Sequence, residues 1–329
     1  MRRAAALMAS LLMLLMSGCT MKELSDVGIV RAVAIDGGDG IYEVTAKVMA
    51  KDGYEYVSAE GATIDTILSR MGNDPYLGQN ELIVVSKDAR RVKAPLEALY
   101  RSSRTGGGEK VVWCEGSAAE YIASGRGGIA SDIPVTDLRV FMNSMESVGR
   151  AVIVPFGKKT APEADEAAII TDYCFDKVMD ESELFGTRIM TDAAGGLTFD
   201  EEVLGDETGI TVEDCSAQVS VDREGGKTAF DIGIIYTFSA DSAGSSRDFR
   251  SGMPAKILKE RTDAMMESFV RSAVSSCQES NGDVLNLATQ CARFGAAPVK
   301  RGEWLLSNMI FRIDADGQRK FDLSERAFG

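Results

Sequence analysis

The chain has 329 residues, with 50 acidic and 36 basic side chains, six cysteines and no histidine. Its net charge of −14 argues against a nucleic-acid-binding protein, which needs a basic face to release counterions from phosphate. Without histidine, a Ser-His-Asp triad, a Cys-His pair and an H-E-x-x-H zinc site are excluded. Hydrophobic residues make up 45% of the chain, which is typical of a globular protein. This composition favours a protein that binds or assembles over an enzyme.

The N-terminus has the pattern of a cleaved leader. Arg2 and Arg3 precede a largely apolar run over residues 4–16. As a helix this run would span only about 20 Å of a hydrocarbon core that is roughly 30 Å thick. We therefore expect residues 1–18 to be a signal peptide and not a membrane-spanning helix. Removal of the two arginines would change the net charge from −14 to −16.

The leader is followed by small residues and a cysteine. Ser17, Gly18 and Cys19 resemble the bacterial lipobox, although Met16 stands where leucine is usual. The resemblance implies that Cys19 receives a diacylglycerol anchor and an acyl chain such as palmitate, and becomes the mature N-terminus. The alternative is an ordinary secretory signal with an incidental cysteine. With the lipid, the protein would be an ectodomain tethered to the extracytoplasmic side of a membrane, and its acidic surface would be repelled by anionic headgroups.

The remaining cysteines are Cys114, Cys174, Cys215, Cys277 and Cys291. An odd number of scattered cysteines without C-x-x-C spacing predicts neither a disulfide framework nor a zinc knuckle. We expect most of the five to be small buried apolar residues.

The first part of the mature chain, residues 19–195, is predicted to be mixed α and β. Residues 27–35 and 41–48 form a hairpin around a glycine-rich turn at 36–40. The apolar patterns then predict helices at 63–71, 93–101, 118–123 and 133–145, and strands at 82–86, 111–114 and 151–156. An acidic stretch at 162–168 is interpreted as a surface loop, and short strands and turns are expected from 169 to about 196, including a strand near 188–189.

An acidic, glycine-bearing segment at 197–210 suggests a boundary, so residues 196–329 are expected to form a second domain. Two strands at 216–221 and 229–238, joined by a turn, precede a linker at 239–251. Helices are expected at 255–277 and 283–293, and a closing strand at 309–313. This order predicts helices packed on an antiparallel sheet. The whole mature chain is therefore expected to be α+β, a multi-subdomain mixed α/β ectodomain with antiparallel sheets and packed helices.

Several segments occur in an order that points to one family. Residues 26–36 carry the pattern D-x-x-I-V-x-A-x-A-I-D, and residues 78–85 carry a G-x-N strand motif. An L-x-G strand motif at 184–186, a long C-terminal helix, a second helix beginning at Asp283 and a final strand ending in Asp-x-Gly at 314–317 follow. Together these segments resemble the Ger(x)C family, the C subunits of bacterial spore nutrient germinant receptors.

The resemblance implies three α/β subdomains, no catalysis and no cofactor. It also implies assembly with two integral-membrane receptor subunits, A-type and B-type, at the spore inner membrane, in the response to nutrient germinants. The expected function is thus a membrane-anchored, non-enzymatic lipoprotein subunit of a spore germinant receptor. The resemblance covers nearly the whole mature chain, and its weight lies in the order and spacing of the six segments.

Candidate chemistry in the sequence is sparse. Four carboxylate clusters are expected to be solvated loops, because a glycosidase needs two carboxyls opposed across a cleft. They are Glu163/Asp165/Glu166, Asp180/Glu181/Glu183, Asp200/Glu201/Glu202 and Asp206/Glu207. Residues 314–317 begin like a calcium loop but lack a glutamate at the twelfth position, so no metal is expected. Trp113 and Trp304 could anchor a partner, although a core role is favoured for each.

Two other functions stay open on the sequence. A solute-binding lipoprotein that works with a transporter would have two Rossmann-like lobes of repeated βαβ units, whereas this chain shows hairpins. An extracytoplasmic hydrolase is disfavoured by the absence of histidine and of a G-x-S-x-G elbow.

Overall fold

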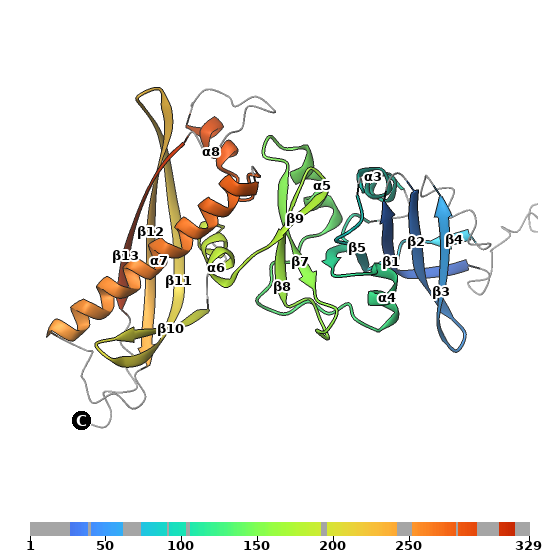
Figure 1. Ribbon diagram of the computed structural model, residues 1–329, viewed down its shortest axis with the longest axis horizontal. Helices are drawn as coiled ribbons and strands as arrows, with labels where there is room; N and C mark the ends of the chain where they lie inside the picture. Colours follow the sequence, from blue (N-terminus) through green and yellow to red (C-terminus); the bar gives the residue numbers. More distant parts are fainter. Residues whose placement is uncertain are drawn as a thin grey trace, which may run out of the picture.

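The computed structural model describes residues 27–38, 41–61, 74–90, 92–102, 106–191, 196–241, 252–280, 282–294 and 309–319. The protein is elongated, with one sheet towards each end and helices between and beside them (Figure 1). The first sheet is built from residues before 180, and the second from residues after 196. The predicted signal peptide at 1–18, Cys19, the helix at 63–71 and Trp304 lie outside the described residues.

The first sheet has nine strands in the order β3-β2-β1-β5-β6-β7-β8-β9, with the short β4 also pairing with β1. The strands are β1 Val27–Gly38, β2 Ile41–Ala50, β3 Gly53–Gly61, β4 Asp74–Tyr76, β5 Leu82–Ser86, β6 Lys110–Cys114, β7 Ala151–Gly157, β8 Glu166–Thr171 and β9 Cys174–Val178. The pairs β1/β5, β5/β6 and β6/β7 are parallel, whereas the hairpins at either end are antiparallel. The sheet therefore has a parallel centre and antiparallel flanks.

Helices cover both faces of this sheet. The helices α3 Lys93–Arg101 and α5 Leu138–Glu146 lie on one face, where Leu96 and Phe141 share a core with Trp113. The helix α4 Ala118–Ala123 lies on the other face, over Ala32 and Val84. Successive residues of a strand point to opposite faces, so the strands in the middle of the sheet are mostly apolar on both faces. The sequence of β5 is accordingly Leu-Ile-Val-Val-Ser, and all five residues are buried.

The second sheet has four strands in the order β10-β11-β12-β13. They are β10 Leu197–Val203, β11 Asp206–Glu224, β12 Lys227–Asp241 and β13 Ile310–Arg319. The first two pairs are antiparallel, and β13 runs parallel to β12. The long helix α7 Gly252–Ser280 lies across this sheet (Figure 1), with α6 Glu181–Met190 and the short α8 Leu287–Arg293 beside it. Phe230, Tyr236, Phe269 and Val270 lie in their common core.

The mixed α/β fold class is confirmed, and most of the strongly patterned elements appear where their sequences predict them. The hairpin β1–β2, the strand β5 and the helices α3 and α4 match their expected residues. The hairpin β11–β12 and the helix α7 are longer than expected but centred as predicted. The predicted helix at 133–145 begins only at Leu138, because Asp137 caps it by accepting a hydrogen bond from the Val140 N–H.

Four expectations are wrong. The stretch at 162–168 is a surface loop only as far as Asp165, because β8 begins at Glu166 and buries Ala167 and Ala168. The expected strands near 184–186 and 188–189 are part of α6. The carboxylates at 200–202 and 206–207, which were expected to lie in solvated loops, belong to the hairpin β10–β11. The predicted helix at 283–293 begins at Leu287, and the closing strand pairs in parallel and continues through residues 314–317.

Candidate acidic cavity between the two sheets

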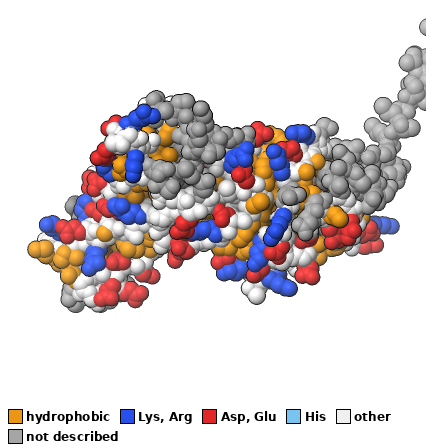
Figure 2. Space-filling model, turned by 45° about the horizontal axis from the view of Figure 1, so that its top comes forward, with side chains coloured by type: hydrophobic (Ala, Val, Ile, Leu, Met, Phe, Trp, Pro, Cys, Tyr) orange, Lys and Arg blue, Asp and Glu red, His pale blue; other side chains and the backbone are white. Residues whose placement is uncertain are grey.

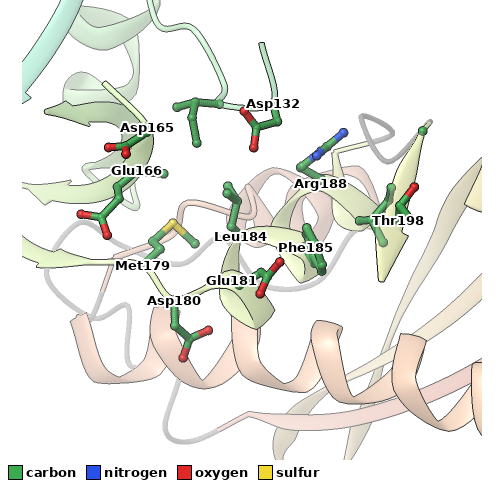
Figure 3. Close-up of a pocket in the computed structure, with 14 residues that line it drawn as sticks. Asp132, Asp165, Glu166, Met179, Asp180, Glu181, Leu184, Phe185, Arg188 and Thr198 are labelled. Atoms are coloured by element: carbon green, nitrogen blue, oxygen red, sulfur yellow. The ribbon is translucent and has the colours of Figure 1, made fainter. Parts of the chain in front are cut away.

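A cavity of about 520 Å³ lies where the end of the first sheet meets α6 and β10. Its walls come from the segment before α5, from the start of β8, from α6 and from the first residues of β10. Figure 3 shows Leu184 and Phe185 of α6 on its floor, with Thr198 of β10 to one side. Elements from both halves of the chain therefore form this site.

Carboxylates dominate the polar lining. Asp132, Asp165, Glu166, Asp180 and Glu181 line the cavity together with a single cation, Arg188. Two of the four carboxylate clusters in the sequence, at 163–166 and 180–183, are thus brought together by the fold. Figure 3 shows Asp165 and Glu166 on the side of the first sheet, and Asp132 facing Arg188 across the cavity. The sequence does not indicate that the two clusters lie close together, because β8 and β9 separate them along the chain.

Two of these carboxylates have structural partners. The Asp180 side chain accepts a hydrogen bond from the Glu183 N–H at 2.8 Å, and Glu183 accepts one from the Asp180 N–H at 2.9 Å. This reciprocal capping box explains why a helix begins here, although the segment was expected to be a strand. Glu166 forms an ion pair with Lys158 at 2.6 Å. Asp180 and Glu166 therefore stabilise the local structure.

Beside the cavity, Glu183 anchors a small charge network. Its side chain is only 10% exposed and lies 2.6 Å from the Lys177 Nζ, which also contacts Glu279 of α7 at 3.3 Å. Burial by itself would lower the pKa of Lys177, but the two glutamates outweigh it and raise that pKa. The network connects β9, α6 and α7, and so links the first sheet to the helices of the second.

The helices α6 and α7 meet at a glycine. A methyl group added at Gly186 would lie 1.9 Å from the Phe269 carbonyl oxygen, which is far inside van der Waals contact. Only glycine lets the two backbones approach so closely. Phe185 then packs edge-on against Phe269, with ring centroids 5.2 Å apart. The L-x-G motif at 184–186 thus has a packing role that the sequence does not indicate.

A second contact between the halves involves Asp283. Its N–H donates to the Gly149 carbonyl at 3.2 Å, and its carboxylate accepts hydrogen bonds from the N–H groups of Leu287 and Ala288, both at 2.7 Å. Burial raises the pKa of Asp283 to about 6, although the two N–H groups lower it. Asp283 therefore connects the start of α8 with the segment between α5 and β7.

The other candidate residues are distributed through the structure without forming a second site. Trp113 is buried and stacks on Phe141, so its predicted core role is confirmed. Cys114, Cys277 and Cys291 are buried, Cys174 is exposed, and no disulfide joins the five cysteines within the described residues. Burial raises the pKa of both Cys114 and Cys277 to about 12, which makes these thiols poor nucleophiles. Residues 314–317 lie in β13, where Asp316 pairs with Lys259 at 2.9 Å.

In chemical terms, the cavity offers carboxylates and one arginine. Among the residues that the structure describes, no group of three or more cysteine, aspartate or glutamate side chains is arranged to hold a metal ion. The carboxylates that face the cavity include a helix cap and a lysine-paired glutamate, and the chain contains no histidine. The arrangement suits a structural junction or a contact surface.

Comparison with known proteins identifies the class. Residues 20–158 match the family model described as the spore germination protein N-terminal domain. A solved structure titled "Crystal Structure of the GerBC protein" matches with a TM-score of 0.62 and 15% identity, over 91% of this chain and 100% of that chain. At this identity, the likeness shows a shared fold. No curated protein sequence matches.

The matched N-terminal domain and the shared fold support the resemblance to the Ger(x)C family of spore germination proteins that the order of the motifs predicts. None of the helices in the described parts of the chain is both long enough and apolar enough to cross a membrane.

Proposed function

We propose that this protein is a lipid-anchored, non-enzymatic subunit of a spore germinant receptor. It would assemble with integral-membrane A-type and B-type subunits, on the extracytoplasmic side of the spore inner membrane. The proposed anchor is a diacylglycerol on Cys19, after removal of residues 1–18.

The observation that carries this proposal is the position of the family domain. The matched germination domain begins at residue 20, directly after the lipobox-like Ser17-Gly18-Cys19. A mature chain that starts at Cys19 would retain the whole matched domain and lose only the leader. The lining of the acidic cavity supports a non-enzymatic role, because two of its carboxylates, Asp180 and Glu166, serve in a helix cap and an ion pair.

We also propose that the mature chain divides near residue 195 into two Ger(x)C-like domains, 19–195 and 196–329. The division separates the two sheets. The helix α6 precedes this point in the sequence but packs against α7, so the domains would be joined by a shared helical layer.

The test is a membrane co-purification with matched cysteine variants. Wild type, Cys19→Ala and Cys174→Ala would be extracted from membranes with mild detergent, and mass spectrometry would identify the associated proteins and the mass of the mature N-terminus. Cys174 is an exposed thiol in β9, so its replacement controls for the loss of any cysteine. We expect wild type and Cys174→Ala to carry the lipid and an integral-membrane partner, and Cys19→Ala to lose the lipid.

Two other outcomes would each refute one part of the proposal. A Cys19→Ala protein that keeps the lipid mass would refute lipidation at this residue. A lipidated wild type that arrives without an integral-membrane protein would refute the assembly, and would favour a solute-binding lipoprotein that works with a transporter. In that case a small solute should raise the melting temperature of the isolated protein.

A further inference from the structure

A second cavity, of about 400 Å³, lies on the face of the first sheet that carries α4, in the right-hand part of Figure 1. It is lined by Arg31 of β1, Lys47 of β2, Lys110 of β6 and Arg126, which follows α4. Glu81 is the one carboxylate of its lining. Four cations against one carboxylate is unusual for a chain with a net charge of −14 and for a surface on which acidic and basic side chains are interspersed (Figure 2).

The cations are held in place largely without being neutralised. Arg31 pairs with Glu81. Lys47 lies 4.4 Å from the centre of the Tyr54 ring, and Arg126 lies 5.9 Å from the centre of the Tyr121 ring. A cation over an aromatic face is oriented but keeps its full charge. Within the described residues, neither Lys47, Lys110 nor Arg126 forms an ion pair with a carboxylate, so the cavity retains a positive charge.

An unpartnered buried amide provides independent evidence for a ligand. Asn80 also lines the cavity and is 8% exposed. Neither its side-chain oxygen nor its side-chain nitrogen has a hydrogen-bond partner among the described residues. A buried donor or acceptor without a partner is costly, and native structures contain few of them. An occupant with oxygen atoms would accept from the amide nitrogen and from the surrounding cations.

We propose that this cavity, defined by Arg31, Lys47, Asn80, Lys110 and Arg126, is a binding site for a small oxyanion, a phosphate or carboxylate group. Guanidinium and ammonium groups from β1, β2, β6 and the segment after α4 line the cavity. They would bind the anion through charge-assisted hydrogen bonds, which are stronger than hydrogen bonds between neutral groups. Ala32, Leu82 and Ile122 give the cavity an apolar wall, which suits a ligand with an organic part next to its anionic group. The anion comes either from a free small molecule or from a lipid headgroup.

The site is separate from the acidic cavity between the sheets, because none of its residues lines that cavity. The lipid source is relevant because β1, which carries Arg31, begins eight residues after Cys19. The two sources share the same phosphate chemistry and are separated by experiment.

The first experiment is calorimetric titration of the full chain, purified in detergent, with inorganic phosphate at constant ionic strength. We expect binding that weakens about tenfold in Lys110→Ala and in Arg126→Ala, because each removes one charge-assisted contact. Lys227→Ala is the matched control, since Lys227 is an exposed lysine at the start of β12. Equal weakening by Lys227→Ala would overturn the proposal, and so would absence of phosphate binding to wild type together with absence of an effect of phosphatidylglycerol.

A second variant keeps the proposal testable if the charge changes disturb folding. Asn80→Leu replaces the unpartnered amide by an apolar side chain of similar size. We expect the melting temperature of the ligand-free protein to stay the same or rise, and the stabilisation by phosphate to be lost. A lower melting temperature with an intact phosphate response would give Asn80 a purely structural role and contradict the assignment.

The source of the anion is determined in nanodiscs of phosphatidylcholine with and without phosphatidylglycerol. If the headgroup occupies the site, phosphatidylglycerol raises the melting temperature of wild type but not of Arg126→Ala. If only inorganic phosphate has this effect, the ligand is a free anion. If neither probe stabilises wild type, the site is refuted. A failure of the chain to enter nanodiscs would count against the lipid anchor and leave the phosphate titration as the test of the site.

Discussion

Asp283 is a buried carboxyl group with two backbone donors. Its two oxygens accept the N–H groups of Leu287 and Ala288, while its own N–H reaches Gly149. Removal from water raises its pKa to about 6. A carboxyl whose pKa is higher in the folded than in the unfolded chain binds its proton more tightly when folded. Its contribution to stability is therefore full below pH 4 and is lost as the pH rises through about 6.

This titration gives a prediction for Asp283→Asn. The variant lacks the ionisable group, so the stability of wild type relative to the variant should fall by about 2 kcal/mol between pH 4 and pH 7. Chemical denaturation of both proteins at several pH values in this range measures the difference. A difference that is the same at every pH would mean that Asp283 titrates alike in the folded and unfolded chain.

Single residues also mark the limit of prediction from the sequence. Asp283 was correctly associated with the second C-terminal helix, but it lies four residues before that helix and caps it from outside. Nothing in the sequence indicates that it also contacts Gly149, because the two residues are more than 130 positions apart. Cys19, the one predicted modification site, lies outside the described residues and stays a prediction.

Among the elements, the packing of α6 on α7 depends on Gly186. An added methyl group would overlap the Phe269 carbonyl, and neither helix backbone can move without disturbing its own core. We expect Gly186→Ala to lower the free energy of unfolding by about 2–3 kcal/mol. Thermal and urea denaturation would measure this loss.

The matched control for this substitution is Gly233→Ala in β12. A methyl group at Gly233 has no neighbouring atom within 4 Å. Its effect should therefore be small. Equal stability of the Gly186→Ala protein and wild type would show that α6 can shift along α7 without cost.

The elements that the sequence predicted well are those whose own periodicity is strong. The strands β5 and β6 are short apolar runs, and α7 keeps one buried face over 29 residues. The segments predicted wrongly are those in which local chemistry and tertiary packing compete. The helix α6 contains a phenylalanine, a glycine and a threonine, which have only moderate or low helix propensity, yet its capping box and its contact with α7 make it helical.

In the whole molecule, two sheets are held together by a narrow junction. The contacts between Gly149 and Asp283, and between Lys177, Glu183 and Glu279, connect the first sheet with the helices of the second. A methyl group at Gly149 would lie 2.1 Å from the Asp283 Cβ and 2.9 Å from its Cα. The junction therefore depends on a close approach that only glycine permits.

We expect Gly149→Ala to loosen this junction without unfolding either sheet. The far-ultraviolet circular dichroism should match that of wild type, while the radius of gyration from small-angle X-ray scattering should increase. Hydrogen exchange should become faster at residues 282–288. Gly106→Ala, where an added methyl group meets open space, is the control. An unchanged radius of gyration with unchanged exchange would contradict this role for Gly149.

The sequence by itself determined the leader pattern, the acidic and histidine-free composition, the strongly periodic strands and helices, and the resemblance to spore germination proteins that the match over residues 20–158 supports. These properties depend on residues that are close together in the chain. Only the tertiary structure decided the parallel centre of the first sheet, the close contacts at Gly149 and Gly186, and the two charged cavities. The physical reason is distance along the chain: Arg31 and Arg126 are 95 positions apart and line one cavity because β1 and α4 pack together.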